Sequence, residues 1–106
     1  MIFNIAGPLL DALVLAVINR SDTYGYEITQ KIRKSTTISE STLYPILRRL
    51  QKDNCLEVYD KEFQGRNRRY YTITAKGKKL LDLYLEEWKL YKVKIETVFL
   101  EGSKDE

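Results

Sequence analysis

The segment from Leu56 to Thr74 has the pattern of a β-hairpin, and it limits the possible folds more than any other part of the chain. Its two runs, LEVYDKE and NRRYYTIT, have strand character, and the FQG sequence between them places Gly65 at or near the tip of the turn. A hairpin tip cannot bury three guanidinium groups, so Arg66, Arg68 and Arg69 must face water or a partner. Alternation along the second run puts its two tyrosines on opposite faces, and we expect one of them in the core.

Three helices are predicted before this hairpin. Apolar residues lie almost all round LLDALVLAVI, which follows Gly7-Pro8, so this first helix should be buried. A second helix is predicted through YGYEITQKIRK and a third through TLYPILRRLQKD, with Ser39 or Ser41 as its N-cap. Because proline is tolerated in a first turn, Pro45 predicts that the third helix starts near Ser41.

One long helix is predicted after the hairpin, capped by Thr74 and covering residues 75–100. Three helices, two strands and a long helix form a winged helix-turn-helix arrangement, a mainly α fold with a β-hairpin (α+β). We therefore expect a winged helix-turn-helix domain in residues 1–74, a C-terminal dimerisation helix in 75–100 and a polar tail in 101–106.

Positive charge is concentrated in the middle of the chain. Residues 36–79 contain ten Lys/Arg and five Asp/Glu, a net charge of +5, whereas residues 80–106 contain four and seven, a net charge of −3. With +1 from residues 1–35, the chain carries +3. Such a basic segment indicates a surface for a polyanion, although an ordinary solvated face would have a similar composition.

The composition argues against an enzyme. The chain has no histidine, one cysteine (Cys55) and no clustered carboxylates, so no nucleophile–base pair, metal site or cofactor site is expected. No basic segment precedes an apolar stretch at the start, and the apolar run Leu9–Ile18 is too short to span a bilayer. We expect a cytoplasmic protein with no membrane contact.

The third helix has the composition of a DNA recognition helix. Hydroxyl groups near its start suit phosphate contacts, and the arginines after them can read guanine edges in the major groove. Ile46, Leu47 and Leu50 should face the core. The candidate DNA-binding residues are Ser39, Ser41, Thr42, Tyr44, Arg48, Arg49 and Lys52 of this helix, with Arg66, Arg68 and Arg69 of the hairpin. Arg66 and Arg68 are the favoured phosphate or minor-groove contacts, and a merely solvated helix face or a solubilising hairpin is the alternative.

The last helix carries a heptad pattern of apolar residues that predicts a helix partner. Its members are spaced 3, 4, 3, 4 and 3 residues apart: Leu81, Tyr84, Trp88, Tyr91, Ile95 and Val98. A neighbouring stripe of Leu80, Leu83 and Leu90 could meet the chain's own core. A symmetric homodimer is the simplest partner, and a helix folded back on its own domain is the alternative. Trp88 lies between Tyr84 and Tyr91, so these rings are a candidate site for a flat aromatic effector, with core packing as the other interpretation.

Three segments resemble the signature segments of PadR-type transcriptional regulators: YGYEI (24–28), STLYPILRRL (41–50) and GRNRRYYTITAKG (65–77). The resemblance covers roughly residues 8–79. It implies a homodimeric DNA-binding regulator, usually a repressor, with the third helix in the major groove and the hairpin on flanking DNA. The short chain resembles the branch of the family that binds multidrug compounds, in which paired tryptophans sandwich aromatic drugs, and Trp88 matches that position.

These observations lead to one expected function and two rivals. We expect a ligand-responsive, homodimeric repressor that binds double-stranded DNA at a two-fold operator. The first rival is a winged-helix module that binds another protein through its basic hairpin. The second is a drug-sequestering protein or enzyme, which only the aromatic site around Trp88 supports.

Overall fold

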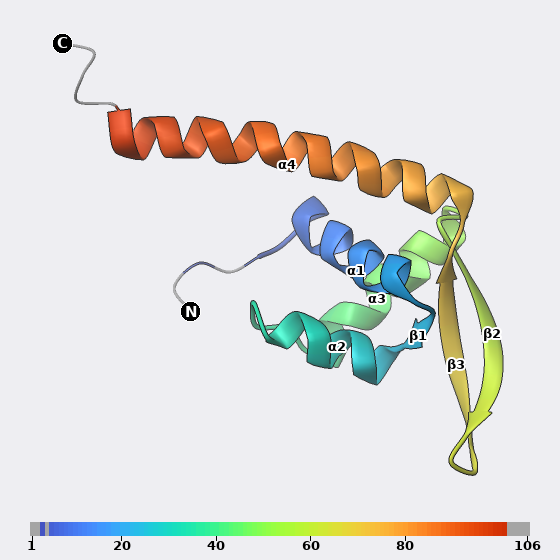
Figure 1. Cartoon of the computed structure of the whole chain (residues 1–106). Coiled ribbons are helices and arrows are strands. Elements are labelled where there is room, and N and C mark those ends of the chain that lie inside the picture. Colours follow the sequence, from blue (N-terminus) through green and yellow to red (C-terminus); the bar gives the residue numbers. More distant parts are fainter. Residues whose placement is uncertain (1–2, 4, 102–106) are drawn as a thin grey trace.

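The computed structural model describes residue 3 and residues 5–101, so the rest of the predicted polar tail (102–106) lies outside the described residues. Three helices form a body, a hairpin stands along one side of it, and a long helix crosses the end opposite the hairpin tip (Figure 1). The elements are α1 (Pro8–Arg20), β1 (Thr23–Tyr24), α2 (Gly25–Arg33), α3 (Glu40–Lys52), β2 (Leu56–Phe63), β3 (Arg66–Ile73) and α4 (Ala75–Glu101). This arrangement confirms the predicted winged helix-turn-helix fold.

The core lies between α1, α2, α3 and the near end of the hairpin. The side chains with almost no exposure come from each of these elements, and they include Val14, Leu15, Ile18, Ile28, Leu43, Leu47, Leu50 and Leu56. Helix α1 is buried as predicted, because it packs on α2 and β3 and is covered by α4. Ile46, Leu47 and Leu50 face the core as predicted, and this leaves the opposite side of α3 at the surface.

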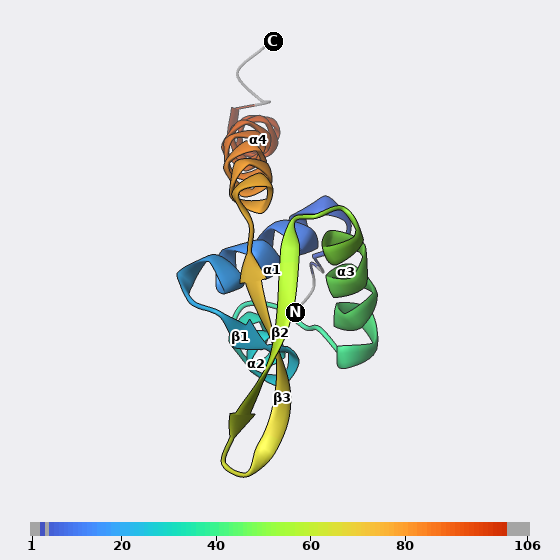
Figure 2. The ribbon, with the colours of Figure 1, turned by 90° about the vertical axis from the view of Figure 1, so that its right-hand side faces the viewer.

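The sheet has the strand order β1-β3-β2, and both pairs are antiparallel. The turn of the hairpin consists of Gln64 and Gly65, whose φ angles are 53° and 77°. Two positive φ angles are typical of the tight turn that matches the twist of paired strands. Figures 1 and 2 show that the hairpin tip points away from α4.

Strand β1 was not predicted, because Tyr24 was expected in the second helix. Two residues carry too little pattern to indicate a strand, and Tyr24 becomes extended only by pairing with Tyr70 of β3. Tyr70 in turn pairs with Tyr59 of β2, so three tyrosines form a row across the outer face of the sheet. The rings of Tyr59 and Tyr70 stack at 5.6 Å, and Tyr24 meets Tyr70 edge-on at 5.4 Å.

The prediction that one tyrosine of β3 belongs to the core is confirmed by Tyr71, and the row buries the second tyrosine, Tyr70, as well. Tyr71 packs into the core on the helix side, whereas Tyr70 is buried on the opposite face by Tyr24 and Tyr59. The two side chains are 7% and 8% exposed. The hydroxyl of Tyr59 donates a hydrogen bond of 2.7 Å to Asp22, which fixes β2 to the loop before β1.

Helix α3 begins one residue earlier than Pro45 predicted. Ser39 is the N-cap, and its hydroxyl accepts a hydrogen bond of 3.3 Å from the amide of Thr42. Pro45 therefore lies in the second turn, where it removes one intrahelical hydrogen bond. Pro45 and Ser41 are both exposed, so water can reach the carbonyl of Ser41 that loses its partner. Asn54, with φ 63°, follows the helix in the left-handed conformation.

The rotation of α4 about its axis also differs from the prediction. Leu80, Leu81 and Tyr84 pack against the chain's own core, whereas Leu83 and Leu90 are exposed. The reason is buried Gly77 in the first turn of α4. An added Cβ there would lie 2.3 Å from the carbonyl oxygen of Cys55. The backbone approaches so closely on this side that the positions three, four and seven residues later face the core. In the single chain, Leu81 and Tyr84 therefore pack against the chain's own core, and their place in a dimer seam stays a prediction.

Candidate nucleic-acid interface

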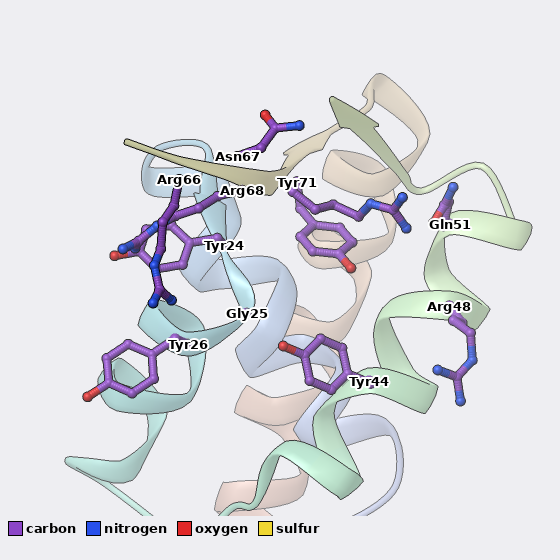
Figure 3. A pocket seen from close by; sticks show the side chains of 11 residues that line it. Tyr24, Gly25, Tyr26, Tyr44, Arg48, Gln51, Arg66, Asn67, Arg68 and Tyr71 are labelled. Carbon is purple, nitrogen blue, oxygen red and sulfur yellow. The ribbon is translucent and has the colours of Figure 1, made fainter. Parts of the chain in front are cut away.

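A cleft of about 690 Å³ lies between α2, α3 and the hairpin (Figure 3). Within the described part of the chain, eleven residues line it, and they include four arginines and no acidic side chain: Tyr24, Gly25, Tyr26, Tyr44, Arg48, Gln51, Arg66, Asn67, Arg68, Arg69 and Tyr71. Fixed positive charge beside phenol rings and amides suits an extended anion with flat or sugar-like parts. Five of the predicted DNA-binding residues meet here: Tyr44, Arg48, Arg66, Arg68 and Arg69.

The start of α3 lies beside this cleft and carries the three predicted hydroxyl residues. The hydroxyl of Ser39 lies 2.9 Å from that of Ser41 and 3.1 Å from that of Thr42. All three side chains are exposed. A helix N-terminus with free amide hydrogens and exposed hydroxyls favours phosphate. Tyr44 follows on the same helix, and its ring packs on Gly25 of α2, where a Cβ would lie 2.7 Å from the tyrosine oxygen.

The three arginines of the hairpin have different surroundings. The guanidinium carbon of Arg68 lies 4.6 Å from the ring centre of Tyr24 and 5.0 Å from that of Phe63. The Nε atom of Arg69 is 3.9 Å from the carboxylate of Asp60. Figure 3 shows Arg66 projecting on the same side as Arg68, near Tyr24. The rings hold Arg68 in one place, whereas Arg66 is exposed near the tip.

The titration of Tyr71 reflects both burial and this charge. Burial raises the pKa of its hydroxyl, and the guanidinium groups of Arg69 and Arg48 act in the opposite direction. The positive charges of one arginine on β3 and one on α3 are therefore both felt at Tyr71, a buried lining residue of the cleft. The cleft is electrostatically positive without a carboxylate among its lining residues.

Two residues of α3 that were predicted to bind DNA, Arg49 and Lys52, do not line the cleft. Arg49 points to α1, where its Nη1 and Nη2 atoms donate hydrogen bonds of 2.7 and 3.1 Å to the carboxylate of Asp11. The hydrogen bond to Asp11 raises the pKa of Arg49. Lys52 is exposed at the end of the helix and does not line the cleft. We therefore do not include Arg49 in the interface proposed below.

Six lining residues of the cleft were not predicted as site residues: Tyr24, Gly25, Tyr26, Gln51, Asn67 and Tyr71. Tyr24 and Tyr26 flank Gly25 in the YGYEI segment, and this glycine between two tyrosines was the available signal. Gln51 is three residues after Arg48, so helical spacing alone could have found it. Nothing in the sequence indicated Asn67 and Tyr71 as site residues, because a polar residue near the turn and an aromatic residue in a strand are common in any hairpin.

An apolar groove of about 280 Å³ lies between α1 and the first half of α4. It is lined by Ile5, Leu9, Ala12, Leu13, Ala16, Leu81, Tyr84, Leu85 and Trp88. Of the three predicted effector residues, the structure brings Tyr84 and Trp88 to this groove. Tyr91 is outside it, with its ring centre 6.4 Å from that of Trp88. Burial raises the pKa of Tyr84, and the charge of Asp11 raises it further.

The sequence profile of the transcriptional regulator PadR-like family matches residues 14–83 of this chain. These residues cover most of α1, the whole sheet, α2, α3 and the start of α4, and so include every lining residue of the cleft. The chain belongs to the PadR-like family.

Solved structures agree with this assignment. The chain is 40% identical to smu.1704 of Streptococcus mutans UA159, with a TM-score of 0.90 over 95% of each chain. A PadR family transcription regulator of Clostridium difficile R20291 is 32% identical, with a TM-score of 0.77 over 86% of this chain and 97% of that one. PadR of Bacillus subtilis, solved in complex with operator DNA, shares the fold at 22% identity, with a TM-score of 0.66 over 73% of this chain and 45% of that one.

The protein is therefore a PadR-like transcriptional regulator, a DNA-binding winged-helix protein and not an enzyme. Within the described residues, no helix combines the length and the apolar character that a membrane crossing requires. The cleft between α3 and the hairpin is the basic surface of this PadR-like protein.

Proposed function

We propose that this PadR-like protein is a homodimeric repressor that binds a two-fold operator and responds to a small aromatic ligand. The observation that carries the proposal is the arginine-lined cleft between α3 and the hairpin. In this arrangement α3 enters the major groove, one phosphate backbone follows the cleft, and the hairpin reaches flanking DNA. The operator complex of the Bacillus subtilis relative, which has the same fold, supports DNA as the ligand of this surface.

The proposed DNA contacts divide into two groups. Ser39, Ser41 and Thr42 at the start of α3 bind phosphate, while Arg48, with Tyr44 beside it, reaches base edges. Arg66, Arg68 and Arg69 neutralise phosphates along the hairpin, and Lys52 adds charge at the end of α3. This division predicts that changes in α3 alter sequence preference and that changes in the hairpin weaken binding to all DNA.

The proposed dimer uses the part of α4 that the chain's own core leaves uncovered. At 1.5 Å per residue the 27 residues of α4 span about 40 Å, and α1 covers only the first half. Trp88, Tyr91, Ile95 and Val98 of the predicted seam are between 39% and 75% exposed in the single chain. Apolar residues at heptad spacing are buried against a partner helix. A second copy of α4 would bring two recognition helices to one two-fold site.

The proposed effector site is the apolar groove between α1 and α4, beside Trp88. A ligand that binds there can move α4 relative to α1, and the distance between the two recognition helices would then change. Two half-sites of one operator lie about 34–36 Å apart, so even a small displacement would weaken DNA binding. The ligand acts only if it binds the DNA-free arrangement more tightly than the DNA-bound one.

Two single substitutions test the proposed roles. We expect Arg48→Gln to reduce the preference for operator over scrambled DNA, because it removes a base contact worth about 1–3 kcal/mol. We expect Arg66→Gln to weaken binding to both duplexes equally and to reduce the slope of log K against log salt by about 0.9. Gel-shift or fluorescence-anisotropy titrations over a salt series measure both quantities.

Lys92→Gln is the matched control, because it removes one positive charge from an exposed position on α4, far along the chain from the cleft. It should leave the affinity and the salt slope unchanged. If Arg66→Gln also leaves binding to scrambled DNA unchanged, the hairpin does not contact phosphates and the assignment of roles is wrong. If the protein binds no duplex even at low salt, the basic surface serves a protein partner instead.

A further inference from the structure

Asp11 of α1 is the only acidic or basic side chain that is buried among the described residues, with 5% of its surface exposed. Both of its carboxylate oxygens accept hydrogen bonds from one guanidinium group, that of Arg49 on α3. The two residues are 38 positions apart in the sequence. The Arg49 side chain is 52% exposed, so one partner of this ion pair is buried and the other reaches the surface.

Stability alone does not account for this pair. Taking a carboxylate out of water costs free energy that the attraction to its partner recovers only in part. An apolar residue of similar size at position 11 would be buried without that cost. The best-attested role of buried charged pairs is to fix one register between elements.

Register matters for α3, because one residue of rotation turns a helix by about 100°. The cleft residues of this helix, Tyr44, Arg48 and Gln51, follow one another along it in Figure 3. Leu43, Leu47 and Leu50 bury the opposite side through contacts that have little directionality. A guanidinium group with two hydrogen bonds to one carboxylate fixes both distance and orientation.

We propose that Asp11 and Arg49 are positioning residues that lock the rotation of the recognition helix on α1, so that specific DNA recognition depends on them although neither touches DNA. The inference rests on the proposed reading of DNA by α3. It assigns Arg49 a different role from that of Arg48, its neighbour in the sequence. The pair also lies near Tyr84 of α4, because the charges of both Asp11 and Arg49 act on the titration of that hydroxyl.

The test compares Asp11→Asn, Arg49→Gln, Arg49→Lys and the Asp11→Asn/Arg49→Gln double variant. Each is titrated with the operator duplex and a scrambled duplex over a salt series. For Asp11→Asn we expect about a tenfold loss in the ratio of specific to nonspecific affinity, the effect of losing one base contact, with an unchanged salt slope. Removing a negative charge would by itself strengthen binding to all DNA, so charge cannot explain this loss.

Two further results are expected if the pair acts as a unit. The double variant should lose no more specificity than either single variant, because residues in one interaction are not additive. Arg49→Lys keeps the charge but not the two parallel hydrogen bonds, and it should also lose specificity. Arg20→Gln, which removes a charge from the exposed end of α1, is the control for charge and should retain full specificity. Thermal unfolding and sedimentation confirm that each variant is folded and has the wild-type oligomeric state.

Two outcomes would overturn the inference alone. One is a wild-type protein that discriminates between the duplexes while Asp11→Asn discriminates equally well. The other is a uniform loss of binding in Arg49→Gln with a salt slope reduced by about 0.9, which would make Arg49 a direct phosphate contact. A wild-type protein that does not discriminate would overturn both the proposed function and the inference.

Discussion

Gly77 is the residue at which α4 joins the winged-helix domain. An added Cβ would lie 2.3 Å from the carbonyl oxygen of Cys55 and 2.7 Å from Cγ1 of Ile73. Alanine is the better helix former by about 1 kcal/mol, but a backbone oxygen cannot move aside as a flexible side chain can. We expect Gly77→Ala to lower the free energy of unfolding by about 1–3 kcal/mol, the usual cost of overpacking.

Urea unfolding of Gly77→Ala beside Lys76→Ala tests this expectation. Lys76 is the preceding residue, is exposed, and should tolerate alanine with little change in stability. A variant at position 77 as stable as the wild type would mean that α4 can shift away from the hairpin. The close approach would then not determine which face of α4 meets the core.

Individual residues were predicted well where one pattern acts alone and poorly where two elements compete. Ser39 as the cap follows from local chemistry, and it is observed. The burial of a second tyrosine, Tyr70, was not predicted, because its partners Tyr24 and Tyr59 belong to two other strands. Arg49 was expected at the DNA surface. Its partner on α1, Asp11, is 38 residues away in the sequence, so no local pattern could indicate the ion pair.

The hairpin depends on its aromatic residues for rigidity as well as on its hydrogen bonds. Arg68 lies between the rings of Tyr24 and Phe63, and each cation–π contact contributes about 0.5–1 kcal/mol at an exposed site. We expect Arg68→Gln to lower the free energy of unfolding by about 1 kcal/mol in addition to weakening DNA binding. Arg66→Gln removes the same charge two residues earlier without these contacts, and it should leave stability unchanged.

Thermal unfolding of the two variants without DNA makes this comparison. Equal stability of Arg66→Gln and Arg68→Gln would contradict the structural role of the rings. In that case Arg68 would be as mobile as Arg66 and would contribute to the hairpin only through its charge.

The order and the type of the long elements were predictable, because α1, α3, β2, β3 and α4 each carry a strong pattern of their own. The short strand β1 was not, since it exists only as an addition to β3. The rotation of α4 about its axis could not be predicted from its apolar pattern either. Its apolar residues form more than one stripe, and Gly77 decides by its close approach to Cys55 which stripe faces the core.

The whole molecule leaves much of its longest helix without a partner in the single chain. It measures 64 × 29 × 20 Å, and α4 forms the projecting arm (Figure 1). Val98 is 75% exposed near the end of this arm. We expect Val98→Asp to shift the dimer towards monomer while leaving the secondary structure of the chain intact, because a charge in a heptad seam must be desolvated.

Analytical ultracentrifugation over a concentration series measures this shift, with Glu96→Gln on the same helix as the control outside the seam. A Val98→Asp variant that sediments as the wild type does would mean that α4 pairs through another stripe. A wild-type protein that is monomeric at high concentration would contradict the proposed dimer itself.

For the molecule as a whole, the distribution of charge along the sequence is what indicates the function. The basic middle third of the chain forms both α3 and the hairpin, and the fold brings their arginines to one cleft. The groove between α1 and α4 was not predicted, because the aromatic site was expected between two chains. Its lining comes from one chain, and it depends on the observed rotation of α4.

The most direct test of the central claim is the binding of the wild-type protein to the DNA upstream of its own gene and to a scrambled duplex, over a salt series. A sequence-reading regulator should bind both duplexes with steep salt dependence and should prefer the native one by about 10³-fold or more. Equal affinity for both duplexes would contradict operator recognition at this site, and absence of binding even at low salt would contradict a DNA-binding role for the cleft.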